Sequence, residues 1–149
     1  MTGLKGKTVF ISGASSGIGK ASAEAFAMAG TRLILCARSI DKITALAEKL
    51  KEHYETECMV IKLDVRDRQA VEEAIDTLPE NWKKIDILLN NAGGAKKKKK
   101  LHEGDPSDWD TMIDTNIKGL LYLTRKIVPL MLKYQLKGHV VNICSIAGI

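Results

Sequence analysis

The stretch that decides the fold is residues 12–19, Ser-Gly-Ala-Ser-Ser-Gly-Ile-Gly. It follows an apolar run at residues 8–11 and precedes residues 21–29, where alanines recur on one helical face. Glycines at this spacing let a backbone approach a pyrophosphate closely, and the start of the following helix offers unpaired N–H groups. We therefore expect a phosphate-binding strand–turn–helix unit, for which the alternative is an ordinary flexible glycine–serine turn.

Four further apolar runs resemble strands, and each is near-continuous, as in parallel strands covered on both faces. They lie at residues 33–36, 59–63, 85–89 and 139–144. Segments of helical period separate them, and Asp41 and Asp67 are placed to cap two of these helices. Strands that alternate with helices predict successive βαβ units, and thus one α/β domain over residues 1–149.

The longest predicted helix covers residues 106–137. It begins with Asp105 as a cap and Pro106 at its first position, and Gly138 is the expected stop. Pro129 predicts a kink or a local break inside it. Its apolar residues occupy more than one stripe, so we expect a second helix or a second subunit against it. A homo-oligomer formed through this helix is the prediction.

The charge of the chain is local. The 149 residues include 23 basic and 18 acidic side chains, a net charge of +5, and residues 96–100 are five consecutive lysines. Outside that run the count is 18 against 18, so the spread basic surface of a nucleic-acid-binding protein is excluded. The lysines mark residues 94–104 as an atypical loop, and a nucleic-acid contact through them is the weakest alternative.

The remaining composition excludes several other classes of protein. Hydrophobic residues make up 45% of the chain, which suits one soluble globular domain. No apolar stretch is long enough for a membrane span, and the first residues do not resemble a signal peptide, so a cytoplasmic protein is expected. Three cysteines without paired spacing predict neither a disulfide framework nor a metal site.

The end of the second predicted strand bears on the choice of dinucleotide. Domains that bind NAD usually carry an acidic residue there for the ribose hydroxyls, whereas this chain has Ala37 and Arg38. Arg38 offers a guanidinium where the 2′-phosphate of NADP would lie, unless it is only a solvated surface arginine. A charge-assisted contact favours NADP over NAD by about tenfold to a hundredfold.

Several motifs together resemble the short-chain dehydrogenase/reductase family. Residues 12–19 look like the family's Thr-Gly-x-x-x-Gly-Ile-Gly with Ser12 in place of threonine, and residues 90–93 match its Asn-Asn-Ala-Gly. Residues 103–116, Glu-Gly-Asp-Pro-Ser-Asp-Trp-Asp-Thr-Met-Ile-Asp-Thr-Asn, are similar to the NADP-dependent 3-hydroxy-acid and serine dehydrogenase branch. The resemblance implies a Rossmann-type doubly wound parallel sheet, with five strands in the order 3-2-1-4-5 and helices on both faces. It also implies hydride transfer between nicotinamide and a small alcohol or carbonyl substrate.

The resemblance further implies a role for each matching residue. The phosphate turn would be Gly13, Ser15, Ser16, Gly17, Ile18 and Gly19; the 2′-phosphate would meet Arg38 and Ser39; the adenine would meet Asp64 and Val65; and the ribose would meet Asn90, Ala92 and Gly93. Ser145 would hold the substrate carbonyl and Asn116 would support the proton relay. Each of these residues also has an ordinary explanation as a turn, cap or strand-end residue.

The family's general acid/base is a tyrosine in a Tyr-x-x-x-Lys motif that closely follows the serine. Only residues 146–149 follow Ser145, and the spacing of Tyr122 and Lys126 falls inside the long predicted helix, where it is not taken as a catalytic pair. We therefore expect the cofactor-binding part of an NADP-dependent oxidoreductase, recorded as a shortened chain that is inactive alone. The alternative is a non-catalytic nucleotide-binding module.

Overall fold

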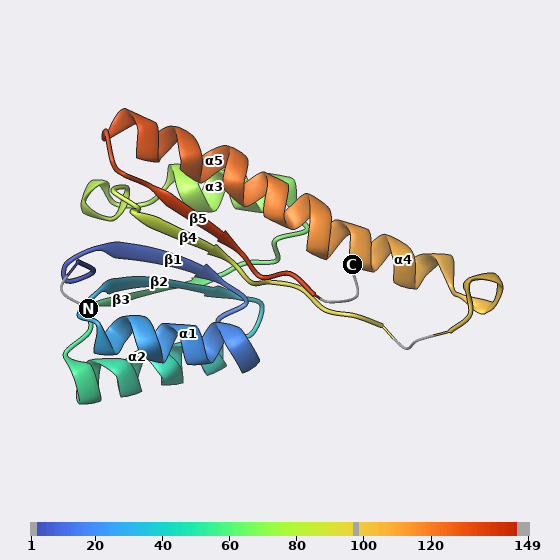
Figure 1. Cartoon of the computed structure of the whole chain (residues 1–149), viewed down its shortest axis with the longest axis horizontal. Coiled ribbons are helices and arrows are strands. Elements are labelled where there is room, and N and C mark those ends of the chain that lie inside the picture. The colour runs from blue at the N-terminus through green and yellow to red at the C-terminus, as the bar shows by residue number, and fades with distance from the viewer. Residues whose placement is uncertain (1–2, 97–98, 146–149) are drawn as a thin grey trace.

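The computed structural model describes residues 3–96 and 99–145, which form an α/β sandwich around one parallel sheet (Figure 1). The strand order in the described chain is β3-β2-β1-β4-β5, and every neighbouring pair is parallel. The strands are β1 Thr8–Ser12, β2 Arg32–Ala37, β3 Cys58–Lys62, β4 Ile87–Asn90 and β5 His139–Asn142. The predicted fold class and strand order are confirmed.

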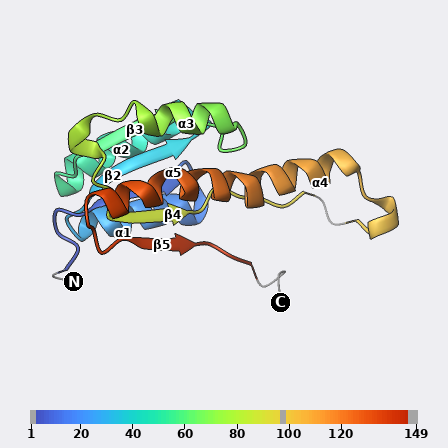
Figure 2. The same ribbon diagram turned by 90° about the horizontal axis from the view of Figure 1, so that it is seen from above.

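Helices cover both faces of the sheet, as the two views in Figures 1 and 2 show. One face carries α1 (Gly17–Met28) and α2 (Ile40–Tyr54), and the other carries α3 (Arg68–Asp76) and α5 (Leu120–Lys133). Each face has its own apolar cluster of buried side chains. This two-sided cover is the physical reason for the near-continuous apolar strands.

The central strand shows the arrangement most clearly. Phe10 belongs to the cluster under α3 and α5, whereas Val9 and Ile11 belong to the cluster under α1 and α2. All three side chains are completely buried. The glycine turn therefore follows the central strand of the sheet, whose apolar side chains are completely buried.

The long predicted helix is present but is neither uniform nor as long as expected. It divides into α4 (Pro106–Ile113), a π-helical segment (Asp114–Gly119) and α5. The prediction of one helix over residues 106–137 is wrong in both respects. Gly119 lies inside the π-helical segment, where an added Cβ would stand 2.6 Å from Val65 Cγ2, so this wider turn packs tightly on the chain after β3. Figure 1 shows α4 extending past the edge of the sheet.

The end of α5 also differs from the prediction. The helix continues through Pro129 and ends at Lys133, because Gln135 takes a left-handed conformation with φ 51°. The amides of Gln135 and Leu136 then donate to the carbonyls of Leu132 and Met131. A left-handed residue with returning hydrogen bonds ends the helix before Gly138 is reached.

The predicted helix starts are confirmed in two of three cases. Asp67 accepts a hydrogen bond from the Ala70 amide, and Asp105 accepts one from the Ser107 amide. Asp41 is not the cap of α2, because the helix begins at Ile40 and Asp41 lies in its first turn. Ser39 takes the cap position instead.

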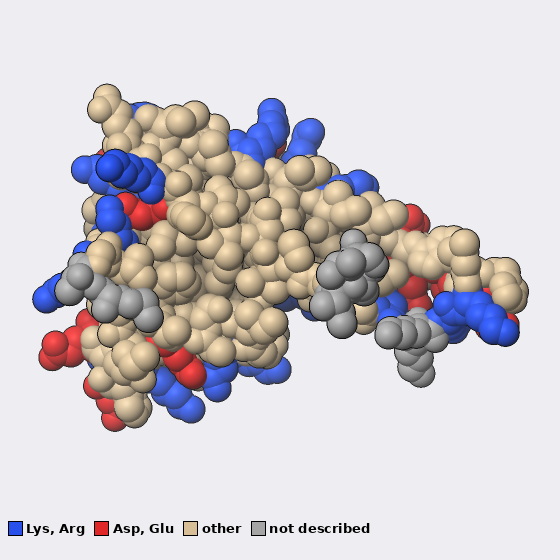
Figure 3. Space-filling view, viewed as in Figure 1, with Lys and Arg blue, Asp and Glu red and all other residues tan. Residues whose placement is uncertain are grey.

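The loop at residues 94–104 is largely irregular where it is described. It contains one short 3-10 turn, Leu101–Glu103, and a second such turn, Glu80–Trp82, precedes β4. Lys97 and Lys98 lie outside the described residues. On the face drawn in Figure 3 the basic side chains lie around the margin, and the middle carries few charges. Over the described chain, no helix has both the length and the apolar character that crossing a membrane requires.

Candidate functional site

The glycine turn has backbone geometry that requires its glycines. Gly13 and Gly17 have φ values of 68° and 53°, in the left-handed region that favours glycine. Gly19 has ordinary dihedrals, but a Cβ there would lie 2.3 Å from the Gly13 carbonyl oxygen. The turn is therefore folded tightly onto the first turn of α1, and the spacing of the three glycines is a steric requirement.

The outer side of the same turn is open, which is the arrangement that a diphosphate needs. A Cβ at Gly17 would meet nothing within 4 Å in the described chain, and Ser16 and Ile18 are exposed. Ser16 occupies the cap position of α1 but makes no side-chain cap hydrogen bond. The amides of the first helical turn are therefore left without a capping side chain, and unpaired amides at a helix N-terminus can bind an anion.

Two residues that the sequence interpretation left without a role hold the turn in place. Ser12 Oγ accepts hydrogen bonds from the amides of Asn91 and Ala92, both at 3.0 Å. Asn91 Nδ2 in turn donates to the carbonyls of Ser12 and Gly13, at 3.0 and 3.1 Å. The loop after β4 is thus bonded directly to the glycine turn. The available signal was the match of Ser12 and Asn91 to motif positions, although neither was assigned a contact.

Asn90, predicted to lie along the ribose, uses its side chain inside the fold. It is 4% exposed, and its Nδ2 donates to Thr124 Oγ1 at 3.0 Å and to Asn142 Oδ1 at 2.9 Å. It thereby joins β4 to α5 and β5. Ala92 and Gly93 follow it at the carboxyl end of β4, half-buried and exposed respectively.

Asn116 is positioned by the π-helical segment and binds the loop after β4. Its Oδ1 accepts from the Gly94 amide at 3.0 Å, and its Nδ2 donates to the Gly94 carbonyl at 2.9 Å. Both polar atoms of the Asn116 side-chain amide are therefore hydrogen-bonded to the backbone of Gly94. The structure shows Asn116 as an anchor for this loop, and its predicted part in a proton relay stays a prediction.

The two residues predicted to contact the adenine, Asp64 and Val65, differ in exposure. Asp64 is half-buried after β3 and forms an ion pair with Arg66, with 2.6 Å between Oδ2 and Nη2. Hydrogen bonding to the Arg66 guanidinium lowers the pKa of the Asp64 carboxyl below its ordinary value. Val65 is 5% exposed and belongs to the core, so its side chain packs inward.

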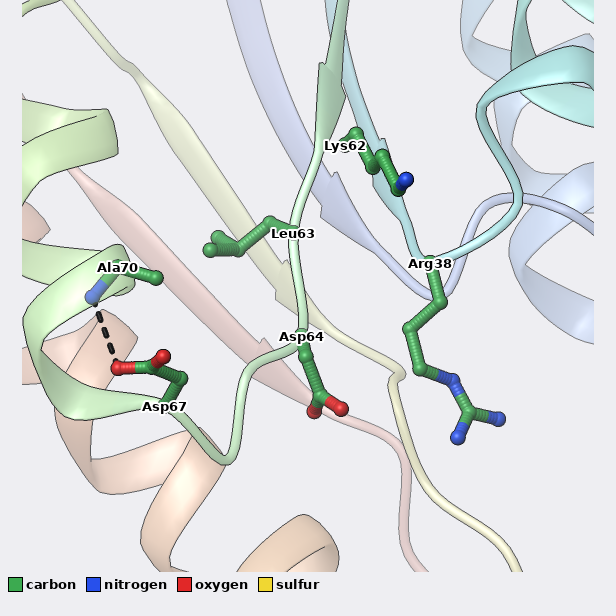
Figure 4. Close-up of a pocket in the computed structure, with 6 residues that line it drawn as sticks. All are labelled: Arg38, Lys62, Leu63, Asp64, Asp67 and Ala70. Atoms are coloured by element: carbon green, nitrogen blue, oxygen red, sulfur yellow. Dashed lines mark hydrogen bonds between the residues drawn. The ribbon is translucent and has the colours of Figure 1, made fainter.

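A pocket of about 390 Å³ opens beside Asp64 at the edge strand β3. Figure 4 shows its lining, which is Arg38, Lys62, Leu63, Asp64, Asp67 and Ala70. Arg38 and Ser39 are exposed and follow β2, and Ser39 makes no cap hydrogen bond at the start of α2. The structure therefore brings Arg38, predicted to meet the 2′-phosphate, and Asp64, predicted to meet the adenine, to one pocket, whereas Ser39 and Val65 are not among the residues that line it.

Ser145 lies apart from the glycine turn in the sequence but at the same edge of the sheet. It is exposed and follows β5, so it stands at the carboxyl ends of the strands with the turns after β1 and β4. Lys126, which shares the Tyr-x-x-x-Lys spacing with Tyr122, binds the Asp76 carboxylate on α3 at 2.6 and 2.8 Å. That pairing gives Lys126 a structural role away from Ser145.

Comparisons with known proteins agree with this geometry. The family model described as short chain dehydrogenase matches residues 7–149. Sulfoacetaldehyde reductase 2 of Chromohalobacter salexigens is 44% identical over 140 residues, 94% of this chain and 55% of that protein. The NADP-dependent 3-hydroxy acid dehydrogenase YdfG of Salmonella typhi is 41% identical over 140 residues, 94% of this chain and 54% of that protein.

Solved structures give the same result. The crystal structure of L-sorbose reductase from Gluconobacter frateurii, complexed with NADPH and L-sorbose, has a TM-score of 0.92 and 30% identity, and covers 99% of this chain and 56% of that one. The chain spans about half the length of the curated relatives it matches. The family model, the shared fold and the ordered motifs agree, and the chain belongs to the short-chain dehydrogenase family.

Proposed function

We propose that the chain forms the cofactor-binding part of an NADP-dependent oxidoreductase that interconverts an alcohol and a carbonyl. The observation that carries the proposal is the open glycine turn at one edge of the sheet, with Arg38 at the end of β2 where NAD-binding domains place an acid. Relatives named for NADP and a neighbour complexed with NADPH support the choice of cofactor.

The residues of the chain suit NADP in their chemistry. The first-turn amides of α1, with Ser15 and Ser16, would hold the diphosphate, because an anion is stabilised at a helix N-terminus. Arg38 and Ser39 would hold the 2′-phosphate, Asp64 and Val65 would border the adenine, and the chain from Asn90 to Gly93 would lie along the ribose. NADP, when bound, supplies the nicotinamide that gives or takes a hydride.

On the substrate side we assign a smaller set of roles. Ser145 would donate a hydrogen bond to the substrate carbonyl and orient it. Asn116 would act as a positioning residue, because its two bonds to Gly94 hold the loop between the cofactor and substrate regions. A 3-hydroxy acid is the proposed substrate class, and the name of the YdfG relative is its support.

Binding and turnover measurements test the proposal separately. NADPH fluorescence should change on titration with the chain, and NADH should bind about tenfold to a hundredfold more weakly. A carbonyl-reduction assay with a 3-oxo acid then asks whether the bound cofactor reacts. Absence of NADPH binding would contradict the proposal.

The alternative is a nucleotide-binding module without catalysis. It is favoured by the engagement of Lys126 with Asp76, which leaves the described chain without a Tyr-x-x-x-Lys pair directed at Ser145. It predicts NADPH binding with no turnover, whether the chain is assayed alone or within any longer protein that contains it. Turnover by either form would exclude the module.

We also propose that α4 and its continuation form a contact between subunits. Four apolar side chains with large exposed fractions recur at every fourth position along it: Trp109 (37%), Ile113 (45%), Ile117 (54%) and Leu121 (55%). Apolar side chains in such a row are typical of a helix that packs against another. Sedimentation of the chain and of an Ile117→Lys variant tests this: association should weaken in the variant, and a monomeric parent chain would contradict it.

A further inference from the structure

The pocket beside Asp64 is lined by a second cation that the family motifs do not include. Lys62 is the last residue of β3, and its register partner on β2 is Ala37, the residue before Arg38. In Figure 4 the Lys62 amino group and the Arg38 guanidinium both lie on the side of β3 that faces the end of β2. Two strands thus deliver two positive charges to one pocket.

Both cations are available for an external anion. Within residues 3–96 and 99–145, neither Arg38 nor Lys62 has a hydrogen-bond or ion-pair partner, and both side chains are exposed. The nearby Asp64 carboxylate is ion-paired with the Arg66 guanidinium and also accepts a hydrogen bond from the Arg66 backbone amide. Asp67 accepts the Ala70 amide in its capping role. The carboxylates that line the pocket therefore accept hydrogen bonds within the described chain, whereas Arg38 acts on Asp64 only through its charge and Lys62 has no hydrogen-bond or ion-pair partner there.

The start of α2 adds to the same positive region. Ser39 occupies the cap position without a side-chain cap hydrogen bond, so its hydroxyl and the first amides of a 15-residue helix are not engaged with each other. A helix N-terminus carries a partial positive charge. An anion near Arg38 would be met from β2, from α2 and from β3.

We propose that Lys62 is a second determinant of cofactor specificity, which contacts the 2′-phosphate of NADP together with Arg38. This inference rests on the proposed function, since it concerns the same cofactor site. A phosphate carries up to two negative charges, and one guanidinium neutralises only one of them. Lys62 supplies the second charge, so the preference for NADP is shared between two strands.

The experiment compares two small probes on the intact chain. Adenosine 2′,5′-bisphosphate carries the 2′-phosphate and adenosine 5′-monophosphate does not, and each is measured in competition with NADPH. Lys62→Gln should weaken the bisphosphate about three- to tenfold and leave the monophosphate unchanged, since an exposed charged contact is worth less than a buried one. Lys62→Arg should retain the affinity, because it keeps the charge.

Lys51→Gln is the matched control. Lys51 is an exposed lysine in the last turn of α2, far along the helix from Ser39, so the same change of charge there should leave both affinities unchanged. A thermal transition for each variant shows whether the fold is kept.

The outcomes distinguish the two proposals. If the parent chain binds NADPH but Lys62→Gln weakens binding of neither probe, or weakens both equally, the proposed role of Lys62 is wrong while the proposed function stands. If the parent chain binds neither cofactor, the proposed function fails, and the role of Lys62 fails with it. Selective loss of the bisphosphate, with rescue by arginine, supports the inference.

Discussion

The glycine-turn side of the sheet (β1 to β3 with α1 and α2) and the Ser145 side (β5 with α4 and α5) contrast in burial. Both contain short apolar strands. In β1, Val9, Phe10 and Ile11 are completely buried, whereas Val140 in β5 and Ile143 just after it are 37 and 38% exposed. Strands with similar sequences therefore differ in burial according to whether they lie at the centre or at the edge of the same sheet.

The difference extends to the functional residues. The glycine turn is fixed by four hydrogen bonds between Ser12, Asn91 and their neighbours, and it leaves a completely buried strand. Ser145 follows an exposed strand that, among the described residues, pairs on one side only. The geometry of the proposed cofactor site can thus be described from the chain itself, whereas the proposed positioning of a substrate by Ser145 depends on how its edge is covered.

Replacing Gly19 with alanine should produce the largest effect. The new Cβ would lie 2.3 Å from the Gly13 carbonyl oxygen, so either the turn or α1 must move. We expect a loss of about 3 kcal/mol or more in the free energy of unfolding and loss of NADPH binding. Urea denaturation and fluorescence titration measure the two effects.

Gly3→Ala is the control for that substitution, because a Cβ at Gly3 meets nothing within 4 Å. Its stability and NADPH affinity should match those of the parent chain. If Gly19→Ala also left stability and NADPH affinity unchanged, the turn would accommodate a Cβ that the structure leaves no room for. The contrast between the two sides of the sheet would then be smaller than proposed.

A matched pair of valine substitutions tests the contrast in burial directly. Val9→Ala should cost about 2–3 kcal/mol, because it leaves a cavity in a completely buried cluster. Val140→Ala removes the same atoms from a 37% exposed side chain and should cost about 1 kcal/mol or less. Equal costs, measured by urea denaturation, would mean that the β5 edge is covered in solution.

The fold could be predicted from the sequence because its main signals are local. Near-continuous apolar runs and helical periods report burial on two faces, and a cap such as Asp105 acts within a few residues. The end of the long helix could not be predicted in this way. Gln135 in a left-handed conformation and the π-helical segment packed on Val65 depend on tertiary contacts, and Gly138 was the stronger local signal.

In the candidate site, too, the features set by local sequence could be predicted and those set by tertiary contacts could not. Gly13, Gly17 and Gly19 could be identified because their spacing is a local steric requirement. The bonds of Asn91 to the glycine turn and of Asn116 to Gly94 join residues 78 and 22 positions apart, so no pattern in the sequence reports them. The proposed role of Lys62 could not be predicted from the sequence for the same reason, since it is the register of β2 with β3 that pairs Lys62 with Ala37, the residue before Arg38.

Arg38→Asp should have a selective effect on the glycine-turn side. The guanidinium that would meet a 2′-phosphate is replaced by a carboxylate that repels it and accepts ribose hydroxyls. NADPH affinity should fall about tenfold to a hundredfold while NADH affinity is kept. Equal loss of both cofactors in parallel titrations would show that Arg38 supports the pocket without contacting the phosphate.

The smallest expected effect is the dependence of stability on the Asp64–Arg66 pair. Hydrogen bonding to Arg66 places the folded pKa of Asp64 below the unfolded value of about 3.9. A carboxyl with a depressed pKa stabilises the fold above its unfolded pKa, and this stabilisation is lost as the pH falls through the folded pKa. Arg66→Gln should therefore be slightly less stable than the parent chain at about pH 7, and the difference should narrow between about pH 5 and about pH 2.

Arg68→Gln is the control. Within the described chain Arg68 makes a 3.8 Å contact with Glu72 and has no contact with Asp64, so the urea midpoint of this variant should follow that of the parent chain. A difference between the parent chain and Arg66→Gln that persisted unchanged at low pH would show that Arg66 acts through packing. The positive charge beside the pocket would then come from Arg38 and Lys62, which line it, and Arg66 would only support the chain after β3.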